Sequence, residues 1–150
     1  MSEIDDLLEA AMYKEIASQA FYTAGQKLTG DPGAVALMTE LAVQESQHLE
    51  SLKKLKEKGI KGGRFLPGKV PNLMLSAHLT GGDTVEGAGL QETLIFAIKR
   101  EQQAMDFYAN MMSVMKDRSA KSLCRRLASA ELGHKYKLET KYEELFLGED

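Results

Sequence analysis

The chain has 150 residues, of which 43% are hydrophobic and 27% charged, and its formal net charge is −3. These values are ordinary for one soluble globular domain and exclude a globally disordered chain. The single Cys excludes an internal disulfide, and a mildly acidic chain without a basic stripe is a poor candidate for nucleic-acid binding. The acidic N-terminus lacks the features of a signal peptide, and the longest apolar run, 94–98, is too short for a membrane span. We therefore expect a cytoplasmic protein with no nucleic-acid or membrane partner.

Four helices are predicted in chain order from apolar residues at helical spacing. Asp31 is the predicted N-cap of the second helix, and Pro32 suits its first position. A glycine-rich segment without a sustained period separates the second helix from the third and indicates a crossover, which is long enough for the second hairpin to start at either end of the first. The expected helices are about 3–29, 32–58, 89–116 and 118–146, and the crossover is about 59–88. This order predicts one all-α domain over 1–150, a four-helix bundle of two antiparallel hairpins.

A shift of 86 residues superimposes the second predicted hairpin on the first. Apolar positions repeat, and so do polar residues in the middle of the apolar stripes. The repeated polar residues are Glu15 and Glu101, Glu45 and Glu131, and His48 and His134. Repetition of apolar positions indicates only two amphipathic halves, whereas repetition of misplaced polar residues indicates a shared site.

The repeated polar residues are expected to lie at one depth. The midpoint between Glu15 and Glu45 is residue 30, at the first turn, and the second hairpin repeats this relation. Residues equally far from the turn of an antiparallel pair lie at the same height, so two hairpins packed about a two-fold axis would bring all six groups together. Burying a carboxylate without a partner costs several kcal/mol. We find no Lys or Arg on these stripes near this depth, and we therefore expect bound cations to neutralise the acids.

Metal ions suit this set of side chains. Four carboxylates carry −4 and two divalent cations carry +4. The spacing Glu-x-x-His, at 45–48 and 131–134, places an oxygen and a nitrogen ligand on one helical face. Mixed carboxylate and imidazole ligation suits iron or manganese, and zinc remains open from the sequence. The pattern therefore predicts a dinuclear metal centre.

The two Glu-x-x-His motifs and the two further core glutamates resemble the ligand set of the ferritin-like di-iron carboxylate family, most closely its rubrerythrin branch. The resemblance covers nearly the whole chain apart from the crossover and implies a ferritin-like bundle with two iron ions. It implies that Glu45 and Glu131 bridge the metals and that the hydroxyls of Tyr22 and Tyr108 reach a ligand carboxylate, although both tyrosines could also be plain core aromatics. The implied terminal ligands are Glu15, Glu101, His48 and His134.

Two positions depart from the rubrerythrin pattern. Full-length rubrerythrins carry a rubredoxin module with paired Cys-x-x-Cys motifs, but this chain has only Cys124, which we interpret as a small buried hydrophobic residue. Ala104 stands where those proteins place an additional Glu. The third histidine, His78, lies alone in the crossover without ligand spacing and is interpreted as a surface residue.

The resemblance implies an oxidoreductase that reduces peroxide or activates oxygen. Electrons would come from an external, rubredoxin-like donor protein, and the long crossover would permit a homodimer with exchanged hairpins. Two alternatives remain open at this point. One is an iron-binding, ferroxidase-type iron-handling protein without substrate turnover, and the other is a metal-free helical interaction module.

Overall fold

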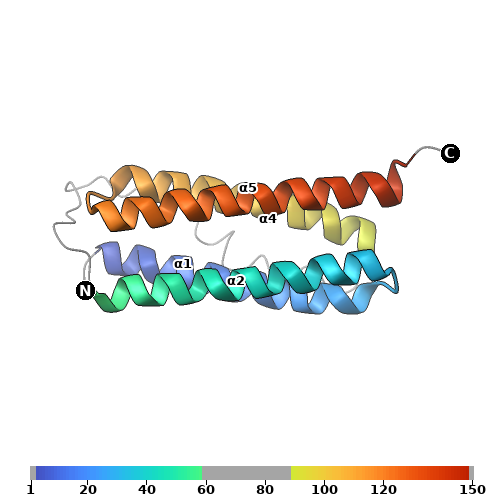
Figure 1. The fold of residues 1–150 in the computed structure, drawn as a ribbon, viewed down its shortest axis with the longest axis horizontal. Helices are drawn as coiled ribbons and strands as arrows, with labels where there is room; N and C mark the ends of the chain where they lie inside the picture. The colour runs from blue at the N-terminus through green and yellow to red at the C-terminus, as the bar shows by residue number, and fades with distance from the viewer. Residues whose placement is uncertain (1–2, 59–88, 149–150) are drawn as a thin grey trace.

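Four long helices make up the described part of the chain, residues 3–58 and 89–148 of a computed structural model (Figure 1). The prediction of an all-α four-helix bundle is confirmed. The predicted crossover, including His78, lies outside the described residues. The helices are α1 (Glu3–Gly25), α2 (Pro32–Lys58), α4 (Leu90–Val114) and α5 (Arg118–Phe146), and the 3-10 turn η1 (Gln26–Leu28) follows α1.

Aspartates begin α2 and α5 at positions 86 residues apart. Asp31 Oδ2 accepts a hydrogen bond of 2.8 Å from the backbone N–H of Ala34, and Asp117 Oδ2 accepts one of 2.9 Å from the N–H of Ala120. Each carboxylate satisfies a backbone N–H that the start of a helix leaves without an intrahelical partner. The predicted capping by Asp31 and the predicted start of α2 at Pro32 are therefore confirmed.

The helices form two hairpins that lie one on the other (Figure 1). α1 packs along α2 and α4 along α5, while the hairpins meet through α1 with α4 and through α2 with α5. Figure 1 shows that α1 and α4 run in opposite directions, as do α2 and α5. The end of α2 and the beginning of α4 therefore lie at opposite ends of the bundle. The sequence left open at which end of the first hairpin the second one starts, and the structure places this start at the end opposite to the end of α2.

The apolar core consists of two clusters separated along the bundle axis. Between them the buried side chains are polar: Glu15 is fully buried, seven residues after Leu8 and six before Phe21. One cluster includes Leu8, Leu52, Phe107, Met111, Leu123 and the buried thiol of Cys124, and the other includes Phe21, Met38, Leu41, Leu94 and Leu138. The clusters hold the four helices together on both sides of a central polar layer.

Candidate metal centre

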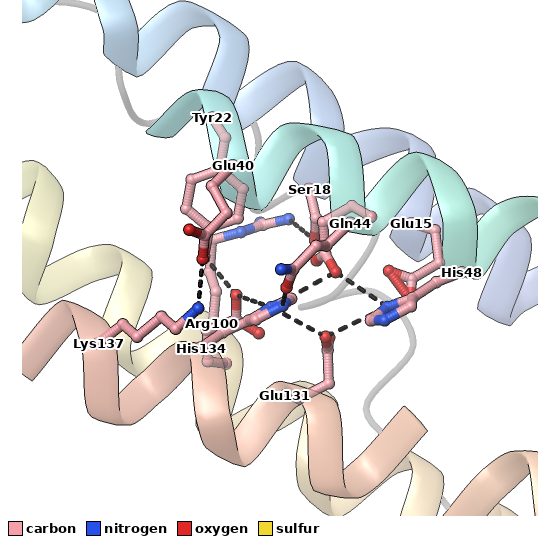
Figure 2. A network of polar contacts seen from close by, with 12 residues as sticks. Glu15, Ser18, Tyr22, Glu40, Gln44, His48, Arg100, Glu131, His134 and Lys137 are labelled. Carbon is pink, nitrogen blue, oxygen red and sulfur yellow. Dashed lines mark hydrogen bonds and ion pairs between the residues drawn. The ribbon is translucent and has the colours of Figure 1, made fainter. Parts of the chain in front are cut away.

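All six repeated polar side chains meet in the central layer, and each of the four helices contributes at least one (Figure 2). α1 contributes Glu15 and α4 contributes Glu101, while α2 and α5 each contribute one Glu-x-x-His pair. The four glutamates are between 0 and 2% exposed. His134 is 2% exposed, and the His48 side chain, at 13%, is the most accessible of the six. Helical spacing and equal distance from the turns therefore brought the predicted groups to one place.

Each imidazole faces one carboxylate that the other imidazole does not contact. Nδ1 of His48 lies 3.5 Å from Glu15 Oε2, and Nδ1 of His134 lies 3.3 Å from Glu101 Oε2. The two rings are nearly parallel, with an interplanar angle of 8° and centroids 5.7 Å apart. These contacts define two equivalent halves, which we call the His48 position (Glu15 and His48) and the His134 position (Glu101 and His134).

The remaining two glutamates are shared by both positions. Oε1 of Glu45 lies 3.1 Å from Nδ1 of His48 and 3.6 Å from Nδ1 of His134. Oε1 of Glu131 lies 3.4 and 3.3 Å from the same two nitrogens. One ligand atom from each of these four residues lies within 4.8 Å of all the others. Each position can thus offer one imidazole, one carboxylate of its own and two common carboxylates.

Several polar atoms in this layer have no hydrogen-bonding partner in the described part of the chain. A buried polar atom that is not bonded destabilises the fold, so such atoms indicate a missing partner. Carboxylate oxygens and imidazole nitrogens with free lone pairs are the ligands that divalent iron, manganese or zinc accept. The donor set therefore fits a pair of divalent cations. The unpaired atoms around the cluster are both oxygens of Glu45, Oε1 of Glu101, Oε1 of Glu131 and Nδ1 of His48.

Two buried tyrosines bond to the carboxylates of Glu15 and Glu101 across the hairpins. The hydroxyl of Tyr108 donates to Glu15 Oε2 at 2.7 Å, and the hydroxyl of Tyr22 donates to Glu101 Oε2. Each tyrosine thus reaches the glutamate of the other hairpin rather than the one on its own helix. Burial and then the nearby carboxylates raise the pKa of both hydroxyls well above the usual value, which keeps them as donors.

An amide orients one of the two imidazoles. Nε2 of His134 lies 2.5 Å from Oε1 of Gln44 (Figure 2). If Nε2 donates to this amide oxygen, Nδ1 of the neutral ring is unprotonated and faces the carboxylates as a ligand must. The repeat-equivalent of Gln44 is Ala130, so this contact belongs to the His134 position.

The apolar stripes carry no Lys or Arg at the depth of the glutamates, but the inference that no side-chain cation reaches these acids is wrong. Lys14 is 2% exposed, and its ammonium donates to Glu131 Oε2 at 2.8 Å and to Glu15 Oε1 at 3.4 Å. The residue lies off the apolar stripe of α1, but its flexible stem passes Tyr108, with Nζ 5.3 Å from the ring centroid, and brings the charge inward. Although burial alone would lower the pKa of Lys14, the surrounding glutamates raise it, so the ammonium stays charged.

A second buried cation, Arg100, occupies the position equivalent to Lys14 in the repeat. Its Nη2 donates to Ser18 Oγ at 3.1 Å, and its Cζ lies 5.0 Å from the centroid of the Phe21 ring. In the described residues it forms no ion pair with the four glutamates. A signal for both cations is present in the sequence, because a basic residue directly precedes the terminal glutamate in each half.

The acids of the cluster hold their protons with different strength. Burial and the charge of Glu131 raise the pKa of Glu45 well above normal and that of Glu101 to about 7. Burial alone would also raise the pKa of Glu131, but the Lys14 ammonium and the His134 imidazole lower it below its usual range. For His134, the contacts with the carboxylates of Glu101 and Glu131 outweigh burial and raise the pKa to about 9. Of the three acids whose pKa shifts, only Glu131 is thus favoured in its ionised form by its surroundings.

We expect the metal-free protein to lose stability as the pH rises from 6 to 9. The pKa of Glu101 is about 7 in the fold against an ordinary 4.5, and that of His134 is about 9 against 6.5. A group whose pKa is raised by folding contributes its full stabilisation at a pH below its ordinary pKa. This contribution is lost as the pH rises through the pKa that the group has in the fold. Thermal unfolding in chelator should give a midpoint several degrees higher at pH 6 than at pH 9, and His134→Gln should reduce the difference. A midpoint that is higher at pH 9 would contradict these shifts.

No protein-family model matches the sequence, and no curated protein does. Solved structures match it at low sequence identity. A hypothetical protein from Pyrococcus furiosus has a TM-score of 0.71 and 23% identity, covering 94% of this chain and 89% of that one. The bacterioferritin-related protein of Bacteroides fragilis, a dodecameric thioferritin, has a TM-score of 0.72 and 16% identity, covering 97% and 90%.

A third match is a two-domain protein of Anabaena variabilis that contains DJ-1/ThiJ/PfpI-like and ferritin-like domains. Its TM-score is 0.75 at 17% identity, and the match covers 98% of this chain but only 41% of the other. Together these matches confirm the ferritin-like fold. None of the described helices is long and apolar enough to cross a membrane.

Proposed function

We propose that this chain is a rubrerythrin-type oxidoreductase, a single domain over 1–150 with a dinuclear metal centre that reduces peroxide or activates oxygen. The observation that carries the proposal is that each imidazole faces one carboxylate of its own and two carboxylates common to both. Iron is the metal that suits this ligand set and this reaction best, with manganese or zinc as the other candidates.

The six repeated side chains would divide between the two ions. Glu45 and Glu131 would contact both, while the His48 and His134 positions would each hold one ion. Two bound iron ions in the reduced state would supply the two electrons that, with two protons, convert hydrogen peroxide into two water molecules. Because the chain has a single Cys, re-reduction would require an external, rubredoxin-like electron donor.

The surrounding residues would keep the ligands in place and limit access. Tyr22 and Tyr108 donate to Glu101 and Glu15, which fixes the orientation of both terminal carboxylates. The glutamates are almost fully buried, and the most accessible group, His48, is only 13% exposed. Such a site suits an oxidant as small as peroxide or oxygen.

Stopped-flow mixing of the reduced, iron-loaded protein with hydrogen peroxide tests the proposal. We expect oxidation of the metal centre, followed by its absorbance, to finish within seconds and to be at least about tenfold slower in Tyr22→Phe/Tyr108→Phe, because the terminal carboxylates lose their donors. Tyr136→Phe is the matched control, since that tyrosine is 70% exposed and has no hydrogen bond to the cluster in the described part of the chain. Iron that is bound as two ions per chain but not oxidised by peroxide or oxygen would contradict the enzymatic function.

An iron-handling function is the second candidate, because the Bacteroides fragilis protein with the same fold is a dodecameric thioferritin. Aerobic iron loading followed by light scattering and metal analysis separates the two. The oxidoreductase should hold no more than two irons per chain and is expected to be a homodimer. Retention of many irons in a large assembly would instead support storage.

A further inference from the structure

Two buried cations occupy equivalent positions of the repeat, but only one of them enters the metal-ligand cluster. The ammonium of Lys14 lies 2.8 Å from Glu131 Oε2 and 3.4 Å from Glu15 Oε1. The guanidinium of Arg100 instead bonds to Ser18 Oγ at 3.1 Å. The two hairpins are therefore equivalent in the six repeated side chains, but they differ in the contacts of the adjacent cations.

The contacts of Lys14 fall on one side of the cluster. Glu15 belongs to the His48 position, and Glu131 is common to both positions. The terminal carboxylate of the His134 position, Glu101, contacts Tyr22 and His134 and forms no ion pair with Lys or Arg among the described residues. An ion at the His48 position would thus have to share carboxylate oxygens with a neighbouring ammonium, and an ion at the His134 position would meet no such competitor at its terminal carboxylate.

We propose that Lys14 makes the two metal positions inequivalent, so that the His134 position fills first and tightly and the His48 position fills second and weakly. The inference rests on the proposed dinuclear centre and adds an order of filling to it. Glu131 would need both of its oxygens to contact two ions, and the ammonium of Lys14 occupies Oε2. To bind the second ion fully, the protein must therefore move this ammonium away from Oε2.

Formal charge supports this order. With all four carboxylates ionised, the form in which they bind metal, they and Lys14 together carry −3, so that the first divalent ion leaves −1 and the second leaves +1. Without Lys14 the same steps would run from −4 through −2 to zero. Like charges in a buried site repel strongly because little water screens them. Lys14 repels each incoming ion, but it lies against Glu15 of the His48 position and not against Glu101, so it opposes the second step more than the first. The proportion of two-ion centres should therefore depend on the concentration of available metal.

Calorimetric titration of the metal-free full chain with Mn²⁺, in the absence of oxygen, tests the inference. The wild type should show two binding steps with Kd values at least about tenfold apart, and Lys14→Met should tighten the second step by at least about tenfold. Lys14→Arg retains the charge and should retain the separation. Arg100→Met is the matched control, since it removes the equivalent cation that bonds to Ser18, and it should leave the separation unchanged.

The order of filling has its own readout. Electron paramagnetic resonance at one equivalent of Mn²⁺ should show isolated ions in the wild type and a fraction of coupled pairs in Lys14→Met. Glu101→Gln should remove the tight step and Glu15→Gln the weak one. Circular dichroism establishes that each variant is folded, and Lys14→Gln serves as the neutral variant if Lys14→Met is not.

Different failures have different meanings. If folded wild-type protein binds no Mn²⁺ or Zn²⁺, the dinuclear centre itself is wrong. If the protein binds two ions but the two Kd values are equal, or if the neutral Lys14 variants leave their separation unchanged, only the role of Lys14 is overturned.

Discussion

Glu131→Gln is expected to destabilise the metal-free protein by about 3 kcal/mol, whereas Glu45→Gln should leave it equally stable or stabilise it. The two residues are equivalent in the repeat, and both face the two imidazoles. They differ because the Lys14 ammonium donates to Glu131 at 2.8 Å. Removing one member of a buried ion pair leaves the other charge uncompensated, which is the more damaging change.

Glu45 is in the opposite situation. Both of its carboxylate oxygens lack a hydrogen-bonding partner in the described residues, and burial together with the charge of Glu131 raises its pKa well above normal. Neutral glutamine of nearly the same shape removes the repulsion without opening a cavity. Glu45→Gln is therefore expected to be neutral or stabilising at pH 8, by up to about 1 kcal/mol.

Denaturant unfolding at pH 8 in the presence of a chelator measures both values. Both variants should also lose the ability to bind two ions. A difference in stability between Glu131→Gln and Glu45→Gln therefore arises from the Lys14 contact and not from the metal. The double variant Lys14→Met/Glu131→Gln is the control, because it removes both members of the pair and should recover much of the loss. Equal destabilisation by Glu45→Gln and Glu131→Gln would show that the Lys14 contact does not stabilise the metal-free fold.

Metal loading of both positions is expected to raise the thermal midpoint by about 15–30 °C. A ligand at a thousand times its Kd stabilises a fold by about 4 kcal/mol for each site, and 1 kcal/mol corresponds to about 2–4 °C for a domain of this size. The bound ions would also neutralise the buried acids that repel one another in the metal-free state. Calorimetric scans with Mn²⁺ and with excess chelator measure the shift.

The histidines provide a matched control for this experiment. His48→Ala/His134→Ala removes both nitrogen ligands and should abolish most of the shift. His78→Ala removes the remaining histidine, which the sequence places outside the ligand pattern, and should preserve it. An undiminished shift in the double variant would mean that the stabilising ions bind elsewhere.

The fold and the convergence of the six repeated groups could be predicted because two independent relations in the sequence agreed, the helical period and the distance from the turn. The helical period placed Glu15 and Glu45 among apolar residues, and the distance from the turn placed them at one depth. Lys14 escaped the same reasoning because it lies one residue, about 100° of helix rotation, away from the stripe on Glu15. A periodicity argument locates the Cα atom, whereas a lysine ammonium lies at the end of a long flexible stem.

The partners of the tyrosines could not be assigned from the sequence either. Tyr22 was expected to reach a carboxylate, but the identity of that carboxylate depends on which helices are neighbours across the hairpins. Because α1 lies against α4 and runs in the opposite direction, Tyr22 meets Glu101 and Tyr108 meets Glu15. The contact of Gln44 was missed for a different reason: its equivalent is Ala130, and a search for repeated residues does not find features present in one half.

The two hairpins bear on how such a chain could arise. Each hairpin carries one terminal glutamate, one Glu-x-x-His motif and one tyrosine, so a protein of half this length would complete the same centre by pairing with its own copy. Fusion of two such copies frees each half to change alone. Lys14 with Arg100 and Ser18 with Ala104 mark positions where the halves now differ, and a symmetric self-association could not have produced those differences. Duplication within one chain thus permits an asymmetric centre built from nearly identical parts.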